Sequence, residues 1–367
     1  MPQPEHTPPP IPDAAGTTGA VGAAGATPGL DIAGFRAWLE SAHPELAGGE
    51  LEASVIVGGK SNLTYAVDGA AVPLIVRRPP LGHVLASAHD MRREHRVIAA
   101  LAGSGIPVPV AIDLVDDTET ATVTGTPFFV MERAPGRTIT RRAQNAEFTR
   151  AGIQAMSTAL AEHLADLHAV DPAQVGLADF GRPDGYIDRQ LKTWQRQLDA
   201  SRSRETPTLD RLQQRLHDQV PASGPAAIVH GDYRLDNALV VGTGDAPRIS
   251  AILDWEMATL GDPLVDLGIL GLYWNVADLP GAGRIVPSAV DVDAGYPTFD
   301  ALVEAYARRS GRSIPNLHWY RAFAAYKLAV ILEGIHLRHS AGETVGAGFD
   351  RIGELVEPLA SAGMEWV

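Results

Sequence analysis

Two polar segments, each preceded by a short apolar run, constrain this sequence more than any other feature. The first is His-Gly-Asp-Tyr-Arg-Leu-Asp-Asn over residues 230–237, which lies between the apolar residues 228–229 and 238–240. After a turn at residues 242–247, a further apolar run over residues 249–253 ends at Asp254. This order predicts two polar loops that begin or end at buried strands.

The residue types in these loops favour phosphoryl transfer from a metal-bound nucleotide. Asp232 is a candidate to accept the proton of an attacking hydroxyl, and Asn237 and Asp254 are candidate magnesium ligands. Oxygen ligands suit this hard cation, and the chain has no cysteine to suggest a softer metal. An acidic surface loop between two strands is the alternative, but it would need no carboxylate after a further buried strand.

These segments resemble the aminoglycoside phosphotransferase family (APH, or choline kinase-like), which is related to the protein kinases. The likeness rests on HGDYRLDN and on LDWEMATLGDPLVDLG, and it extends from about Gly58 to about Arg338. It is strongest to the kinase-like branch that in some organisms is fused to acyl-CoA dehydrogenases. The resemblance implies a two-lobed, protein-kinase-like α+β fold, with a small antiparallel lobe that contains one helix and a larger, mainly helical lobe.

Composition limits the classes of protein and partner. The chain has 367 residues, of which 45% are hydrophobic, and a formal net charge of −14. This charge argues against binding to nucleic acid or to an anionic membrane, although it would suit a polycationic substrate. No apolar run reaches the length of a membrane helix, and no signal peptide is recognisable, so we expect a cytoplasmic protein. The oligomeric state stays open.

The chain divides into three predicted parts. Residues 1–29 are rich in Pro, Ala, Gly and Thr, which predicts a disordered tail. Residues 30–135 form the predicted nucleotide-binding lobe, and residues 136–367 the catalytic and substrate lobe. The strands expected in the first lobe cover residues 51–57, 63–67, 73–76, 111–115 and 126–131, and helices are expected at residues 31–39 and 86–103. The helices expected in the second lobe include residues 146–169, 186–201, 209–218, 267–274, 300–309, 319–338 and 349–359.

A glycine-containing turn joins the first two predicted strands. Its sequence is Gly58-Gly59-Lys60-Ser61-Asn62, and glycines of this kind let backbone amides approach phosphates closely. An ordinary hairpin is the alternative. The resemblance implies that the turn covers the nucleotide, with Gly59, Ser61, Asn62 and their neighbours near the β- and γ-phosphates.

Arg77 ends the third predicted strand, where kinase folds usually have a lysine for the α- and β-phosphates. An arginine can hold phosphate oxygens bidentately, so the role remains chemically sound. The resemblance pairs Arg77 with Glu94 on the following helix. The alternatives are an exposed Arg77 and a solvated Glu94.

The resemblance also implies an adenine site at the end of the fifth strand. The carbonyl of Glu132 and the amide of Ala134 would bind the base, and Met131 would pack behind it. Met131 is equally compatible with a plain position in the core.

Other polar residues near the two loops have both structural and functional interpretations. Arg234 matches a kinase position whose cation contacts the transferred phosphate, and the alternative is a salt bridge to Asp236 or Glu256. We expect structural roles for five others, which are His168, His230, Gly231, Asp262 and Asp266. Tyr326, Glu333 and His336 are weaker candidates for a surface that faces the substrate.

The expected function is therefore magnesium-dependent transfer of the γ-phosphate of ATP or GTP to a hydroxyl of a small molecule. The branch resemblance implies a hydroxyacyl-CoA or hydroxy acid as the acceptor. An aminoglycoside or other small-alcohol kinase is the first alternative. The second alternative is a nucleotide-binding protein without transferase activity, which the arginine at position 77 keeps open.

Overall fold

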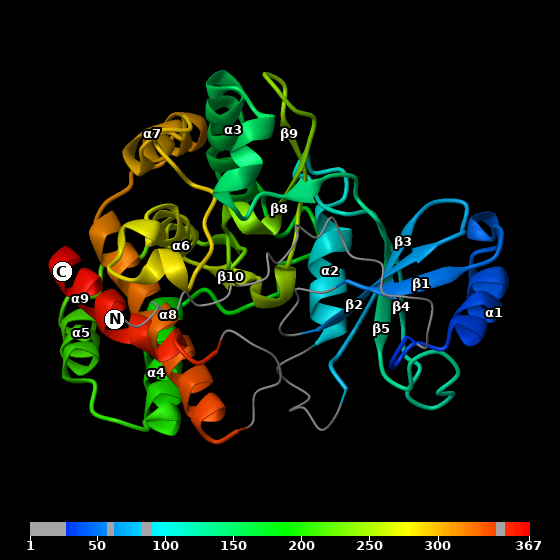
Figure 1. Cartoon of the computed structure of the whole chain (residues 1–367), viewed down its shortest axis with the longest axis horizontal. Helices are drawn as coiled ribbons and strands as arrows, with labels where there is room; N and C mark the ends of the chain where they lie inside the picture. The colour runs from blue at the N-terminus through cyan, green and yellow to red at the C-terminus, as the bar shows by residue number, and fades with distance from the viewer. Residues whose placement is uncertain (1–26, 57–61, 82–89, 343–348) are drawn as a thin grey trace, which may run out of the picture.

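The computed structural model describes residues 27–56, 62–81, 90–342 and 349–367, so the prediction for tail residues 1–26 lies outside the described residues. Figure 1 shows a small sheet with its helices beside a larger, mainly helical part. The predicted two-lobed α+β fold is confirmed by this arrangement of one five-stranded antiparallel sheet and a helical C-terminal part.

The N-terminal sheet has the strand order β1-β2-β3-β5-β4, and each neighbouring pair is antiparallel. Its strands are β1 (Glu52–Val55), β2 (Leu63–Asp68), β3 (Leu74–Arg78), β4 (Ala111–Val115) and β5 (Phe128–Glu132). The edge strand β4 contains an irregularity, because its pairing with β5 skips from Ala111 to Asp113. One residue of β4 is thus extra relative to its partner, which is the geometry of a β-bulge.

Both faces of this sheet are buried, and alternating side chains of each central strand point to different cores. Phe128 and Val130 of β5 belong to a cluster with Phe35 and Leu39 of helix α1 (Ile32–Ala42). The intervening residue Phe129 packs instead in the main core. That core also contains the apolar face of helix α2 (Met91–Leu101), which begins at the N-cap Asp90. The sheet therefore has a helix against each face, in the two regions where the residue pattern predicted helices, whereas the family resemblance implied one helix.

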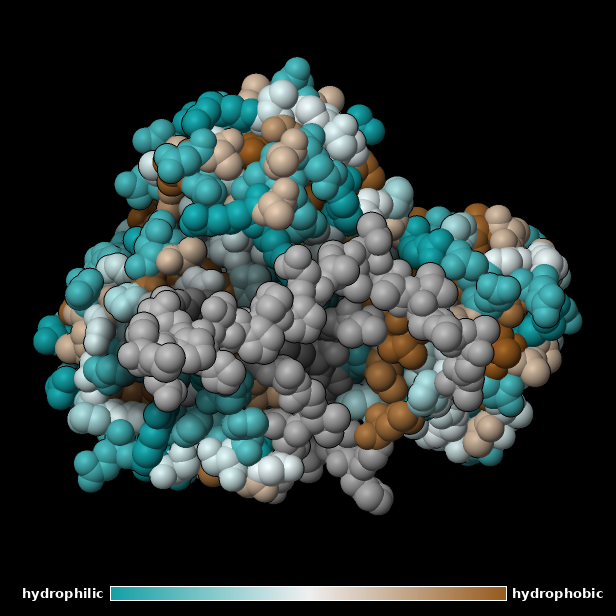
Figure 2. Space-filling view, in the orientation of Figure 1, coloured by the Kyte–Doolittle hydropathy of each residue, from teal (hydrophilic) through white to brown (hydrophobic). Residues whose placement is uncertain are grey.

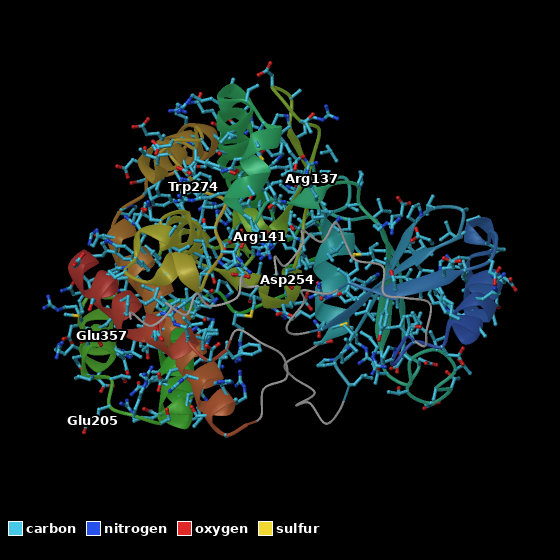
Figure 3. The ribbon with its side chains drawn as sticks, viewed as in Figure 1. Arg137, Arg141, Glu205, Asp254, Trp274 and Glu357 are labelled. Atoms are coloured by element: carbon cyan, nitrogen blue, oxygen red, sulfur yellow. The ribbon has the colours of Figure 1, made fainter. Side chains whose placement is uncertain are left out.

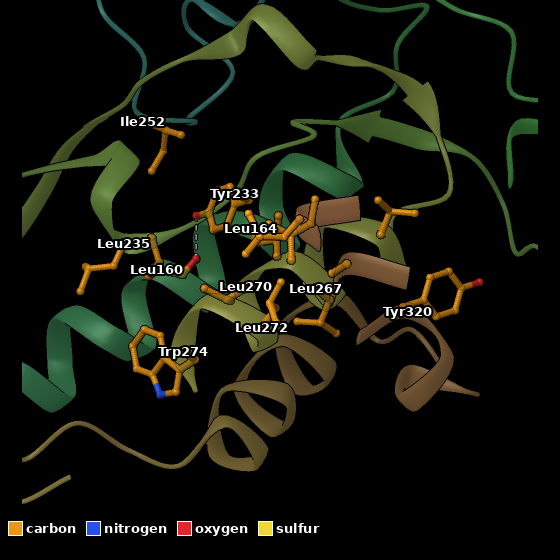
Figure 4. Close-up of a cluster of buried hydrophobic side chains, with 14 of the residues drawn as sticks. Leu160, Leu164, Tyr233, Leu235, Ile252, Leu267, Leu270, Leu272, Trp274 and Tyr320 are labelled. Carbon is orange, nitrogen blue, oxygen red and sulfur yellow. Dashed lines mark hydrogen bonds between the residues drawn. The ribbon is translucent and has the colours of Figure 1, made fainter. Parts of the chain in front are cut away.

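Two helices with little polar surface organise the C-terminal part. Its helices are α3 (Arg150–Ala169), α4 (Tyr186–Ser201), α5 (Pro207–Asp218), α6 (Leu264–Trp274), α7 (Phe299–Ser310), α8 (Leu317–Ser340) and α9 (Val356–Trp366). Buried residues occur on nearly all sides of α6 and α8, so these two lie in the interior. Figure 4 shows Leu267 and Leu270 of α6 close to Leu160 and Leu164 of α3.

Short strands position the two polar loops between the lobes. The strands β6 (Arg137–Thr138), β8 (Ala238–Val241) and β9 (Arg248–Ile252) form one small antiparallel sheet. The strands β7 (Ala227–Val229) and β10 (Thr259–Gly261) form a two-stranded ribbon. The first polar loop joins β7 to β8, and Asp254 follows β9, as the apolar runs predicted.

The boundaries of several elements differ from the predictions. The helix predicted from residue 146 begins at Arg150, because the side chain of Thr149 accepts a hydrogen bond from the Gly152 amide at 3.1 Å and caps it. The final helix starts later and ends later than predicted, since a 3₁₀ turn at Ile352–Leu355 precedes α9. The strands β6 and β10 have two and three residues, which is too short to produce a readable periodicity.

Polar residues cover much of the helical part on the face shown in Figure 2, with apolar residues scattered among them. No helix in the described ranges has the length and apolar character needed to cross a bilayer. The prediction of a cytoplasmic location is not tested by this observation.

Candidate active site

The backbone of the loop that follows β7 is held by a carboxylate from helix α6. Asp266, in the first turn of α6, accepts hydrogen bonds from the backbone amides of His230 and Gly231, both at 2.7 Å. His168 of α3 approaches the same carboxylate at 3.2 Å. Burial disfavours the ionised form of Asp266, but the hydrogen bond and charge of His168, with the loop amides, hold its pKa below the usual value. Asp266 and His168 therefore have the structural positions that we expected.

His230 also fixes the loop rather than facing solvent. Its Nε2 lies 3.0 Å from the carbonyl oxygen of Leu253, and its Nδ1 lies 3.2 Å from the backbone nitrogen of Asp232. A single tautomer with the proton on Nε2 satisfies both contacts. The ring packs on Trp255 at 4.6 Å between centroids. His230 thus connects the first polar loop to the segment that contains Asp254.

Three predicted residues of this loop meet at the carboxylate of Asp232. The side-chain amide of Asn237 donates to Asp232 Oδ2 at 3.0 Å and to the Asp232 carbonyl at 2.9 Å. Arg234 Nε donates to the same Oδ2 at 3.2 Å. Because Asn237 uses its nitrogen here, its amide oxygen is the atom that would bind a cation.

Arg234 is held from three sides. Besides Asp232, it contacts Asp236 through Nη1 at 3.2 Å, and its guanidinium lies 4.6 Å from the ring centre of Tyr273. Burial opposes its charge, yet Asp232, Tyr273 and Asp236 raise the pKa of Arg234 above its usual value. Burial, only partly offset by Arg234, raises the pKa of Asp236 to about 6. The salt bridge to Asp236 that was the alternative interpretation is present, together with the contact to Asp232.

Asp254 lies where the two lobes meet, as Figure 3 shows. Its backbone is in the left-handed region, with φ 67° and ψ 61°, which is unusual for a residue with a side chain. The backbone amide of the preceding residue, Leu253, donates to the carbonyl of Asn237 at 2.7 Å. The two candidate metal ligands therefore come from adjacent, hydrogen-bonded segments.

Arg77 connects the lobes. From β3 its Nε lies 3.1 Å from Glu94 of α2, and its Nη2 lies 2.9 Å from Asp254 and 3.7 Å from Glu256. Only 13% of the Arg77 side chain is exposed, so the alternative of an exposed arginine does not apply. The expected Arg77–Glu94 pair is present, and α2 thereby aligns β3 with the second polar loop.

Glu94 is nearly inaccessible, with 1% of its side chain exposed. Burial raises the pKa of Glu94 to about 7, although the charge of Arg77 acts in the opposite direction. The carboxylates of Asp254 and Glu256 add to the rise. The same carboxylates, with Glu94, raise the pKa of Arg77 against the effect of burial. The cluster thus keeps a charged guanidinium among three acidic groups.

The turn between β1 and β2 is described only at its end. The side-chain amide of Asn62 donates to Glu256 at 3.0 Å, which brings this turn to the second polar loop. Gly59 and Ser61, predicted near phosphates, lie outside the described residues. Glu256 was considered only as a partner of Arg234, whereas the structure places it against Asn62 and Arg77. The sequence signal for a role of Glu256 in the site was its position, two residues after Asp254.

The predicted adenine segment begins at the end of β5. Met131 is buried in the main core, with 7% of the residue exposed. The backbone amides of Glu132 and Arg133 donate to the carbonyl oxygens of Val110 and Pro73, at 2.8 Å each. The segments on both sides of β5 therefore fix the direction of the backbone here. Within the described part of the chain, the amide of Ala134 has no hydrogen-bond partner. This geometry leaves a donor near the junction of the lobes.

Sequence reasoning assigned no role to Lys327, on α8. Its Nζ donates to the carbonyl oxygen of Gly231 at 2.8 Å. The signal was a single charged residue in the otherwise apolar segment 322–332. Two of the weaker candidates on the same helix are buried, namely Tyr326 and Glu333, and Glu333 lies 2.8 Å from Arg204. His336, the third of them, lies farther along α8.

Comparison with known proteins gives a consistent result. The family model described as "Phosphotransferase enzyme family" matches residues 52–323. Acyl-CoA dehydrogenase family member 10 of Mus musculus is 34% identical over 312 residues, which is 84% of this chain and 28% of the mouse protein. The chain thus spans less than a third of that relative, as the covered share shows.

Solved structures resemble this one over most of their length. A candidate aminoglycoside phosphotransferase of Ralstonia eutropha JMP134 has 31% identity and a TM-score of 0.78, with 92% of this chain and 98% of that chain covered. Aminoglycoside phosphotransferase APH(4)-Ia, in a ternary complex with ADP and hygromycin B, has 15% identity and a TM-score of 0.57, with 90% and 98% covered. The second likeness concerns the fold alone.

The matched family region extends from β1 into the first turns of α8, and it contains both polar loops and Arg77. The chain therefore belongs to the phosphotransferase enzyme family.

Proposed function

We propose that this chain transfers the γ-phosphoryl group of ATP or GTP to a hydroxyl of a small molecule, with magnesium. One observation carries the proposal. A single loop brings the side chains of Arg234 and Asn237 each within 3.2 Å of the Asp232 carboxylate, beside the segment that contains Asp254. Phosphoryl transfer needs positioning and charge neutralisation rather than covalent participation by the protein, and this arrangement supplies both.

The proposed step balances as follows. The acceptor hydroxyl oxygen forms a bond to the γ-phosphorus, and the bond from that phosphorus to the β-phosphate oxygen breaks, which releases a nucleoside diphosphate. Asp232 accepts the hydroxyl proton and later passes it to solvent. Arg234 stabilises the charge that develops on the transferred group. Its contacts to Asp232 and Tyr273 hold it in the loop.

The side chains present fit a magnesium nucleotide. Asn237 and Asp254 offer amide and carboxylate oxygens, which are the ligands that magnesium prefers, and the ion would neutralise phosphate charge. The described residues hold no cluster of three or more His, Cys, Asp or Glu side chains suited to a metal, so phosphate oxygens would complete the coordination. Arg77 and the turn that contains Gly59, Ser61 and Asn62 would bind phosphates. The adenine would lie against Met131, Glu132 and Ala134.

For the acceptor we propose a hydroxyacyl-CoA or a related hydroxy acid. The similarity to proteins named as acyl-CoA dehydrogenase family members supports this class. The first alternative, an aminoglycoside or other small alcohol, has support from the similar fold that holds hygromycin B. The second alternative, nucleotide binding without transfer, is favoured by Arg77 in place of lysine. The ion pair of Arg77 with Glu94 argues against this second alternative, because it is the pair that a lysine and a glutamate form in active kinases.

The acceptor test is nucleotide consumption by the purified protein with ATP or GTP and magnesium. The panel contains hydroxyacyl-CoAs, free hydroxy acids and aminoglycosides, and mass spectrometry identifies the products. A phosphorylated hydroxyacyl-CoA or hydroxy acid supports the proposed acceptor. A phosphorylated aminoglycoside would replace it with the first alternative. Tight nucleotide binding without product from any acceptor would favour the second.

We predict that Asp232→Asn lowers turnover by about 10³-fold, because the neutral amide cannot accept the proton. Nucleotide affinity, measured by calorimetry, stays within about threefold, since the phosphate and base contacts remain. The matched control is Asp218→Asn, which makes the same change at an exposed position on α5. Equal loss of binding and turnover in Asp232→Asn would contradict the assignment of the proton acceptor.

A further inference from the structure

A lysine reaches the proposed catalytic loop from the interior helix α8. Lys327 is the single charged residue in the segment 322–332, and its neighbours on the helix belong to the main core. Its Nζ donates to the Gly231 carbonyl at 2.8 Å and lies 5.4 Å from the ring centre of Trp194 on α4. A carbonyl oxygen and an aromatic face are both favourable partners for a partly buried ammonium group.

This contact acts on one particular peptide group. The peptide that joins Gly231 to Asp232 has its carbonyl oxygen held by Lys327 and its amide held by His230 Nδ1 at 3.2 Å. The preceding peptide groups donate to Asp266. The backbone that leads into Asp232 is therefore held by side chains of α6 and α8. Because this peptide plane directly precedes Cα of Asp232, it sets the direction of that carboxylate.

The lysine also brings charge to the loop. Burial lowers the pKa of Lys327, whereas the negative charges of Asp232 and Asp266 oppose this change. Even partial burial of an ammonium group costs free energy, and a carbonyl oxygen alone could be satisfied by a neutral donor. The positive charge on Lys327 is favoured by Asp232 and Asp266, an interaction that a neutral donor lacks.

We propose that Lys327 is a positioning residue for phosphoryl transfer, which orients the Gly231–Asp232 peptide and contributes a positive charge to the loop. This inference rests on the proposed function. Lys327 acts through the loop, so its loss is expected to reduce the rate of transfer while nucleotide binding, which depends on other residues, is kept.

The experiment compares Lys327→Met, Lys327→Arg and the control Arg321→Met, each as the full chain. Lys327→Met keeps the length and apolar stem but removes the donor and the charge. We expect its kcat to fall about 10–100-fold, with the KM for nucleotide within about twofold, because misplacement of a reacting group lowers turnover. Lys327→Arg keeps charge and donor and is expected to recover most of that loss.

Arg321→Met removes a partly buried cation from the same helix, at a position that packs on Trp366 and Phe299 rather than on the loop. It is expected to leave kcat and KM near the wild-type values. Hydrogen exchange of the peptide that covers residues 228–236 supplies a readout that does not depend on turnover. This exchange is expected to be faster in Lys327→Met and unchanged in Arg321→Met.

The outcomes separate the two proposals. If the wild type turns over and Lys327→Met has the same kcat, the role of Lys327 is overturned and the proposed function stays intact. A parallel fall in kcat and in the fraction of protein that binds nucleotide would also overturn it, since that pattern indicates unfolding. Wild-type protein without turnover on any acceptor would overturn the proposed function, and with it the role of Lys327 in transfer.

Discussion

At Glu94, burial and an ion pair act on one carboxyl group in opposite directions. Burial removes water from the group and favours its protonated form, while Arg77 at 3.1 Å favours the ionised form. Burial has the larger effect, so the pKa rises from 4.5 to about 7. The same balance recurs at Asp236, whose pKa rises to about 6 beside Arg234. Both groups lie within contact distance of cations in the proposed site.

The sign of the resulting pH dependence follows from proton binding. Between pH 4.5 and about 7 the folded protein holds a proton on Glu94 that the unfolded chain lacks, so the free energy of unfolding falls as pH rises. We predict that Glu94→Gln, which cannot titrate, gains stability relative to the wild type between pH 5 and pH 7.5. Urea unfolding at both pH values measures the difference in free energy of unfolding between the two proteins. The contribution of Asp236 cancels in this difference, because both proteins contain it. A relative loss of stability in Glu94→Gln over this range would mean that Arg77 outweighs burial.

At the scale of elements, the first polar loop depends on a close approach at Gly231. Its φ is +86°, and a Cβ built there would lie 2.7 Å from both Cβ and the carbonyl oxygen of Met257. Met257 belongs to the 3₁₀ turn Trp255–Met257, directly after Asp254. The glycine therefore lets two polar loops from different strands touch, which brings Asp232 and Asp254 into one site.

We predict that Gly231→Ala lowers the free energy of unfolding by about 1–3 kcal/mol and lowers turnover by more than about tenfold. Gly244→Ala is a matched control, because Gly244 also has a positive φ, of +60°, but has nothing within 4 Å of the added Cβ. The control is expected to lose stability while its turnover stays unchanged. If both variants lost turnover equally, the loss in Gly231→Ala would be due to backbone strain rather than to contact with Met257. Thermal unfolding and steady-state kinetics supply both measurements.

The elements that the sequence predicts best are those with a long or regular apolar pattern. The strands around the first polar loop were predicted because each is a short apolar run that ends at a polar residue. The start of α3 was missed by four residues, since the cap at Thr149 has no periodicity of its own. The contact of Lys327 with the first polar loop was also missed, because it joins residues 96 positions apart. Such contacts depend on how helices pack, which a local pattern does not record.

At the scale of the whole molecule, Arg77 is a connection between the lobes. It leaves β3 of the N-terminal sheet and reaches Asp254 and Glu256 of the C-terminal part, while Asn62 reaches Glu256 from the turn that precedes β2. The neighbouring Arg78 has a different environment, since it donates to the carbonyl oxygens of Gly29 and Thr124. Two adjacent arginines thus point to opposite faces of the sheet, and one of them joins the lobes.

We predict that Arg77→Lys weakens nucleotide binding by about tenfold, because one ammonium group cannot reproduce the forked contacts of a guanidinium. Arg78→Lys is the control, and it is expected to change thermal stability while nucleotide affinity stays unchanged. Titration calorimetry with ATP and magnesium measures both variants. Unchanged affinity in Arg77→Lys would remove the argument for a role of Arg77 in phosphate binding.

The β-bulge in strand β4 has a consequence for how the length of this chain can vary. A one-residue deletion in β5 would exchange Phe128 and Val130 with Phe129 and Met131, and so present each core with the side chains of the other. At the edge, β4 already accommodates one unmatched residue between Ala111 and Asp113. Insertions and deletions in the sheet are therefore expected to accumulate at this edge strand, while the central strands, one of which carries Arg77, keep a constant length.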